Sequence, residues 1–102
     1  MAVIDSILKE EIQRLKALRA RYATQLAEIP NGTVVIKTKS GHRYAYRAYR
    51  KGRRVVTDYL GPEASPNVRH IAALVQKRRK ILGEIKALDA DSARLQKMIN
   101  AR

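Results

Sequence analysis

Cysteine is absent from the 102-residue chain, which excludes a disulfide framework and any zinc or redox site built on thiolates. Long apolar runs are absent too, because charged residues interrupt every hydrophobic stretch, and we therefore expect no segment to cross a bilayer. Residues 1–12 include Asp5, Glu10 and Glu11, and acidic residues at these positions argue against a secretory signal or a basic transit peptide. Together these absences predict a cytoplasmic protein without a membrane partner.

Acidic residues are scarce as well. Nine of them stand against 22 lysines and arginines, which gives a formal net charge of +13. The excess is concentrated in residues 32–80, where thirteen basic residues are offset only by Asp58 and Glu63. The flanking segments 1–31 and 81–102 each carry a net charge of +1. A polyanionic partner that meets the middle of the chain explains this distribution better than basicity for solubility alone, which predicts an even spread.

The first long segment, residues 1–30, has the apolar period of an amphipathic helix, with hydrophobic residues at steps of three and four. Proline, asparagine and glycine at positions 30–32 end the pattern, since these residues do not continue a helix. The stripe expected to face the core is formed by Ile4, Leu8, Ile12, Leu15, Leu18, Tyr22, Leu26 and Ile29.

A second helix is predicted over residues 65–101, with Ser65 as its N-cap and Pro66 in its first turn. Its apolar stripe continues through four heptads, which is typical of a coiled coil. The expected core positions are Ile71, Leu74, Arg78, Ile81, Ile85, Leu88, Ser92, Leu95 and Ile99, of which two are polar.

Residues 32–61, between the two helices, are rich in β-branched and aromatic residues, and their pattern is that of strands. Ser40-Gly41 and Lys51-Gly52 are two-residue hairpin signals. We therefore predict an antiparallel meander with strands at 33–39, 42–50 and 53–60.

This order predicts a single α+β domain over residues 1–102, in which a long N-terminal helix and a long C-terminal helix form an antiparallel coiled-coil hairpin around a three-stranded meander. The second helix is the longer one, so we expect its far end, near Leu95–Ile99, to lack a partner within the chain. A homodimer through the helices would cover that end.

If both two-residue turns are taken literally, strand alternation divides the side chains of the meander between two faces. Tyr44, Tyr46 and Tyr59 share one face with Lys37 and Lys39. The opposite face holds a more compact aliphatic cluster, so we expect it to pack on the helices and leave the tyrosines outside, surrounded by lysine and arginine. The aliphatic cluster consists of Val34, Ile36, Ala45, Val56 and Leu60.

Basic residues interleaved with aromatic ones are typical of a nucleic-acid-binding surface. Lysine and arginine neutralise phosphates, arginine also binds guanine in the major groove, and tyrosine bonds a phosphate or stacks on an unpaired base. We therefore predict a non-enzymatic nucleic-acid-binding protein that uses its basic sheet, with DNA favoured over RNA. The candidate contact residues are Lys37, Lys39, Arg43, Tyr44, Tyr46, Arg47, Arg50, Lys51, Arg53 and Arg54 on the meander, and Lys77, Arg79 and Lys80 on the second helix.

Simpler explanations exist for single residues. Each tyrosine could be a cross-strand packing partner without a ligand, and the basic run at 76–80 could be an exposed coiled-coil flank. Two other functions also remain open. A protein-interaction or inhibitor module of phage or mobile-element type would dock its basic tip on an acidic protein surface. A purely structural coiled-coil oligomer would leave the central charge unexplained.

Signals for catalysis are few. His42 and His70 have neither a cysteine nor clustered carboxylates near them in the sequence, and the glycines lack the spacing of a phosphate-binding loop. We therefore expect no enzymatic activity, no metal, no cofactor and no small-molecule substrate.

Residues 42–74 also resemble a known domain. Their succession of strand, tight turn, strand, the tripeptide Tyr59-Leu60-Gly61 and a helix is similar to the N-terminal arm-binding domain of tyrosine recombinases. In that family a three-stranded sheet enters the major groove, and the resemblance implies the same use of the sheet here.

Over its whole length the sequence resembles a group of small basic prokaryotic proteins in which a three-stranded core lies between charged helices. Asn31 replaces the acid usual in that core, and Ala45 and Arg47 interrupt its more apolar tyrosine run. The resemblance implies a prokaryotic or viral origin, with related segments in mobile elements, and no particular biochemical activity. The matching residues are Pro30, Gly32, Thr33, Lys37, Gly41, Tyr44, Tyr46, Tyr49, Arg50, Gly52, Tyr59, Leu60 and Gly61.

Overall fold

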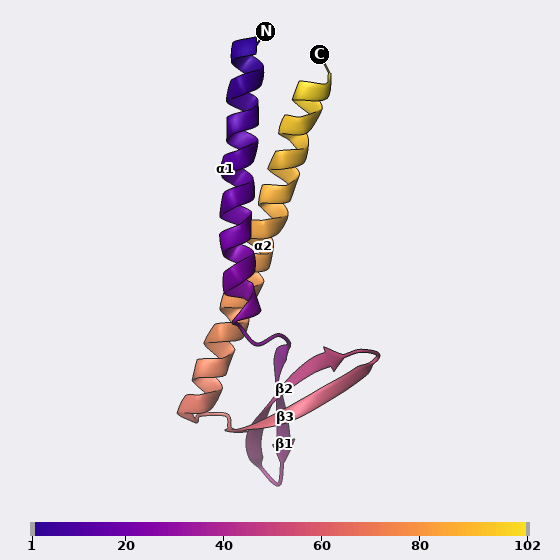
Figure 1. Ribbon diagram of the computed structural model, residues 1–102. Helices are drawn as coiled ribbons and strands as arrows, with labels where there is room; N and C mark the ends of the chain where they lie inside the picture. Colours follow the sequence, from indigo (N-terminus) through magenta and orange to yellow (C-terminus); the bar gives the residue numbers. More distant parts are fainter. Residues whose placement is uncertain (1, 102) are drawn as a thin grey trace. The chain divides into compact units, whose positions relative to one another are not determined.

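The computed structural model describes residues 2–101, which form two helices and a three-stranded sheet (Figure 1). This α+β arrangement confirms the predicted fold class. The elements in chain order are α1 (Ala2–Ala27), β1 (Thr33–Lys39), β2 (His42–Lys51), β3 (Arg54–Pro62) and α2 (Pro66–Asn100). Over the described residues, neither helix contains an uncharged apolar stretch long enough to cross a membrane.

Contacts group the chain into two compact units that share α2. We call residues 1–28 with 80–102 the helical hairpin and residues 29–79 the sheet unit. The first turns of α2, as far as Arg79, belong to the sheet unit, and the remainder belongs to the helical hairpin.

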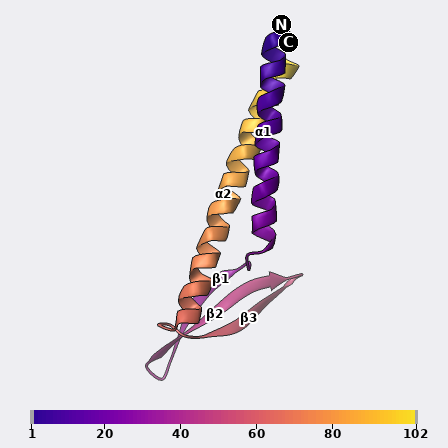
Figure 2. The same cartoon turned by 60° about the vertical axis from the view of Figure 1, so that its left-hand side comes forward.

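In the helical hairpin, α1 and α2 run antiparallel, as predicted, so the start of α1 and the end of α2 lie at the same end (Figures 1 and 2). Ile12, Leu15 and Ile81 are buried between the helices, each with an exposed fraction of 5%. Arg19 Nε donates to Asp89 Oδ1 over 2.6 Å, and this contact defines the register of the two helices. From Ile81 onward, every predicted core position of α2 is buried or half-buried, which confirms the heptad assignment there.

The unpaired end of the hairpin is not the one expected. Leu95 lines a shallow pocket together with Leu15 of α1, so the prediction that the far end of α2 lacks a partner is wrong. The extra length of α2 lies at its start, in the sheet unit. With Arg19 level with Asp89, the first turns of α1 extend past the end of α2. Accordingly Val3 and Ile7 are 72% and 58% exposed.

The sheet is antiparallel with the order β1-β2-β3. The first turn is Ser40-Gly41, as predicted, and both residues have a positive φ, of 52° and 79°. Two successive positive φ values define a type I′ turn, whose twist matches that of the flanking strands. Register follows directly from this turn, since Lys39 pairs with His42.

The second turn consists of Gly52 and Arg53, because Lys51 pairs with Arg54. The prediction placed Lys51 and Gly52 in the turn and is wrong by one position. Gly52 has a φ of 65° and Arg53 a negative one, so glycine takes the first central position, as in a type II′ turn. The predicted placement would have forced Lys51 into the left-handed region, which is costly for a side chain with a Cβ. From Tyr46 to Lys51 the pairing shifts by two residues relative to the prediction, so these residues keep their predicted faces. A bulge between Ala45 and Tyr46 shifts the register by one further residue, and Ala45 pairs with Gly61.

The first turns of α2 cover one face of the sheet. Asn67 Nδ2 donates to Leu60 O on β3 over 2.9 Å, and Arg79 Nη2 donates to Thr33 Oγ1 on β1 over 3.4 Å, so this part of α2 spans the sheet from edge to edge. Ala45 on the central strand is fully buried, and Val68 and Val75 of α2 are 5% exposed. The covered face is thus the one with the aliphatic cluster, as expected from the sequence.

Candidate nucleic-acid interface

The uncovered face of the sheet brings the tyrosines and several basic residues together. Directly opposed residues share a face, and the register opposes Lys37 to Tyr44, Tyr46 to Tyr59 and Arg50 to Val55. Two of these side chains are strongly exposed, Tyr59 by 58% and Val55 by 64%. We call this surface the tyrosine face, and it comprises Lys37, Lys39, His42, Tyr44, Tyr46, Arg50, Val55, Thr57 and Tyr59.

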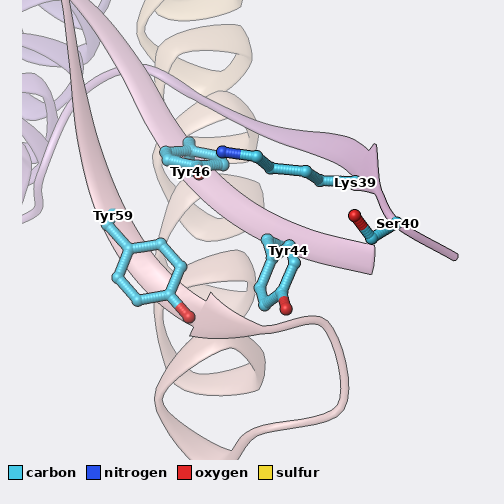
Figure 3. A pocket seen from close by; sticks show the side chains of 5 residues that line it. All are labelled: Lys39, Ser40, Tyr44, Tyr46 and Tyr59. Carbon is cyan, nitrogen blue, oxygen red and sulfur yellow. The ribbon is translucent and has the colours of Figure 1, made fainter. Parts of the chain in front are cut away.

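Three tyrosine rings form a continuous cluster on the tyrosine face (Figure 3). The ring centroids of Tyr46 and Tyr59 are 5.4 Å apart and those of Tyr44 and Tyr59 are 6.2 Å apart. Both pairs are tilted, by 56° and 55°, so no ring stacks flat on its neighbour. Lys37 Nζ lies 4.9 Å from the centroid of Tyr46, a favourable cation–π contact.

An open hollow of about 470 Å³ lies among these rings, lined by Lys39, Ser40, Tyr44, Tyr46 and Tyr59. In Figure 3 the side chain of Lys39 extends toward Tyr46, while the hydroxyls of Tyr44 and Tyr59 point the same way. The hollow is therefore lined by aromatic rings, one ammonium group and four residues that carry a hydroxyl group. Tyr59 and Ser40 were not among the candidate contact residues, although strand alternation had placed Tyr59 on this face.

The carboxylates of the sheet unit lie on the covered side. This unit contains only two acids, Asp58 and Glu63, against twelve lysines and arginines. Arg43 binds Glu63 through both Nε and Nη2, at distances of 2.9 and 2.8 Å. This hydrogen-bonded pair holds the pKa of Glu63 below and that of Arg43 above their ordinary values. As a result the tyrosine face carries no carboxylate to offset its cations.

Arg47 has structural contacts on the covered side. Its Nη2 lies 3.4 Å from Asp58 Oδ2, and its Nη1 donates to Asn31 O over 3.1 Å. Its guanidinium also lies 4.1 Å above the ring of Tyr49, and its side chain is only 18% exposed. Arg43 and Arg47 were candidate contact residues, but the structure places both on the side opposite the tyrosines and pairs each with an acid.

The end of the β2–β3 hairpin concentrates four cations. Lys51 is directly opposed to Arg54, Arg53 lies in the turn, and Arg50 is the adjacent residue of the tyrosine face. All four are exposed. Like charges directly opposed across a ladder are destabilising, and a bound polyanion would relieve that repulsion. We call residues 50, 51, 53 and 54 the basic tip.

The three candidates on α2 have different surroundings. Arg79 donates to Thr33 Oγ1 at the edge of β1, and Lys77 is exposed within the sheet unit. Lys80 belongs to the helical hairpin. The neighbouring Arg78 is half-buried and donates through Nη1 to Ile29 O over 3.3 Å. Within the described residues, no group of three or more histidine, aspartate or glutamate side chains is arranged to hold a metal ion.

A protein-family comparison places this sheet in a wider group. The family described as a domain of unknown function, DUF6788, matches residues 6–70. The chain belongs to the DUF6788 family. The DUF6788 match includes the whole sheet, most of α1 and the beginning of α2, and hence every residue of the tyrosine face and the basic tip. No curated protein and no solved structure matches the chain.

Proposed function

We propose that this protein is a non-enzymatic nucleic-acid-binding protein, with DNA as the favoured partner, and that the tyrosine face and the basic tip form its contact surface. The observation that carries the proposal is the separation of charge within the sheet unit. Asp58 and Glu63 pair with arginines on the covered side. The charged residues of the exposed side are therefore all lysines and arginines. We place the protein in the cytoplasm, where such a partner is present.

Binding would be dominated by the phosphate backbone. Lys37, Lys39 and the basic tip together supply six cations. Each phosphate that they neutralise releases condensed counterions, which is the main source of affinity for this kind of surface. A small sheet of this kind also fits the major groove, where arginine can bind guanine in addition to phosphate.

Fluorescence anisotropy with labelled duplex DNA tests the proposal. We expect binding whose logarithmic affinity falls with the logarithm of salt concentration at a slope of roughly −3 to −5, as neutralisation of several phosphates requires. A triple variant, Lys37→Gln, Lys39→Gln and Arg50→Gln, should weaken binding and flatten the slope. The matched control is Lys9→Gln, Lys16→Gln and Lys86→Gln in the helical hairpin, which removes the same charge from exposed positions. Absence of binding at low salt, or equal loss in both triple variants, would reject the proposal.

A second function is supported by the apolar exposure of the same surface. Tyr59 and Val55 are more than half exposed, Val55 is directly opposed to Arg50, and tyrosine and arginine are common anchors of protein–protein interfaces. The surface could therefore dock on an acidic protein, as an interaction or inhibitor module would. Affinity purification after nuclease treatment separates the two functions. Recovery of an acidic protein that needs the tyrosine face, without salt-dependent DNA binding, would favour the second.

A further inference from the structure

We propose that the hollow among Tyr44, Tyr46 and Tyr59 receives an unpaired base, so that the protein binds single-stranded nucleic acid more tightly than duplex. This inference rests on the proposed function and adds the form of nucleic acid that the site prefers. The inference concerns the tyrosine face alone. The basic tip has no aromatic ring, and we expect it to bind the phosphates of single and double strands equally well.

The tilted packing of the tyrosines leaves ring surface for a ligand. If Tyr59 were only a cross-strand packing partner, its ring would be covered by its neighbours. Instead it is 58% exposed, although it contacts rings on both sides at 5.4 and 6.2 Å. Exposed aromatic rings beside cations are the usual platform for unpaired bases, because every base has a flat face to stack and the contact tolerates any sequence.

Lys37 and Lys39 lie on the same side of β1 and are two residues apart, which corresponds to about 7 Å along a strand. That separation is comparable with the distance between successive phosphates of an extended nucleic-acid strand. Lys37 Nζ lies against Tyr46 and Lys39 lines the hollow, so both ammonium groups lie where the backbone of a stacked nucleotide would pass. The Tyr44, Tyr59 and Ser40 hydroxyls can bond the edge of the base or the backbone.

A base in a duplex cannot use this site. Both faces of such a base are covered by neighbouring base pairs. The tyrosine rings would therefore meet only the phosphates and sugars of a paired strand. On a duplex, the tyrosines could contribute only through their hydroxyl groups, whereas on a single strand they contribute through their rings. Removal of the ring and removal of the hydroxyl therefore have different consequences in the two cases.

The test compares three labelled probes with equal numbers of phosphates: an oligothymidylate of about 12 nucleotides, an abasic deoxyribose-phosphate oligomer of the same length, and a duplex with the same phosphate count. We expect the oligothymidylate to bind roughly tenfold more tightly than the abasic oligomer, because only the first can stack. Tyr59→Leu should remove most of that difference, whereas Tyr59→Phe should preserve it. Both variants change an exposed side chain, and circular dichroism checks that they stay folded.

Four results would overturn the inference. Equal, salt-dependent affinity for all three probes would mean that the protein binds backbone alone, and the proposed function would stand without the preference for single strands. A preference for oligothymidylate that survives Tyr59→Leu would place the stacking site elsewhere. Loss of binding on Tyr59→Phe would assign the role to the hydroxyl. No binding of any probe at low salt would reject the inference and the proposed function together.

Discussion

Arg43 and Arg47 are held by Glu63 and Asp58, whereas Arg50 and Arg53 lie in a tip that contains no acid. The first two arginines therefore already have a counter-charge, and a phosphate that bound them would compete with a carboxylate. The other two repel their neighbours until an anion arrives. Position within one short meander thus decides whether an arginine supports the fold or is available to a ligand.

The first prediction concerns these four arginines. Arg50→Ala and Arg53→Ala should each lower the affinity for nucleic acid roughly fivefold at low salt and reduce the salt slope by about one. Arg43→Ala and Arg47→Ala should change affinity little, and Arg47→Ala should lower the melting temperature because it leaves Asp58 unpaired and uncovers Tyr49. Anisotropy and thermal denaturation measure the two effects separately. The reverse pattern would place the contact surface on the covered side.

At the scale of elements, the connection between α1 and β1 depends on Gly32. Its φ of 108° lies where residues with a Cβ are strained, and a Cβ built there would lie 2.4 Å from the carbonyl oxygen of Ala48. The obstacle is backbone of the central strand and cannot move aside without disturbing the sheet. Gly83, in the middle of α2, has open space where a Cβ would be placed. Its only effect there is the loss of helix stability that glycine causes relative to alanine.

The second prediction contrasts these glycines. Gly32→Ala should destabilise the fold by about 1–3 kcal/mol or more, since strain and a backbone clash add. Gly83→Ala should stabilise it by about 0.5–1 kcal/mol, because alanine restricts the unfolded chain and favours the helix. Urea denaturation of both variants measures the differences. A neutral Gly32→Ala would mean that the start of β1 differs from the structure described.

The elements and their coarse arrangement could be predicted from local signals, but the individual long-range residue pairs could not. Heptad spacing, the Ser40-Gly41 turn and strand alternation each depend on residues close in sequence, so both helices and both sheet faces followed from them. The choice between Lys51-Gly52 and Gly52-Arg53 depends on which residue takes the positive φ, and glycine takes it at lower cost than lysine, which the prediction did not weigh. The pairing of Arg19 with Asp89 and of Arg43 with Glu63 spans 70 and 20 residues, and no periodicity reveals it.

At the scale of the whole molecule, the helical hairpin has little core of its own. Among its described residues only Ile12, Leu15 and Ile81 are buried, because two helices can enclose no more than one stripe. Val3, Ile4 and Ile7 of α1 and Met98 of α2 remain exposed at the same end. We propose a second copy of the chain as the occupant of this surface, since two hairpins would complete a four-helix bundle with a shared core.

The third prediction concerns this homodimer. Light scattering coupled to size-exclusion chromatography should give twice the mass of the 11.6 kDa chain at micromolar concentration. Ile4→Glu combined with Ile7→Glu should yield a monomer, because charges would be buried in the shared core. Ala17→Glu, at an exposed position in the middle of α1, is the matched control and should remain dimeric. A wild-type chain that is monomeric at these concentrations contradicts the prediction.

The strand order β1-β2-β3 leaves the sheet with two edges and no closure. Exposed edges recruit foreign strands unless something repels them, and charged side chains are a common safeguard. Lys37 and Lys39 stand along β1, and Arg54 begins β3. The same cations that we assign to a polyanion thus also keep one sheet from joining another. Neutralising these residues should therefore promote self-association of the sheet as well as weaken nucleic-acid binding. A variant with a less basic sheet would need another feature to protect each edge strand.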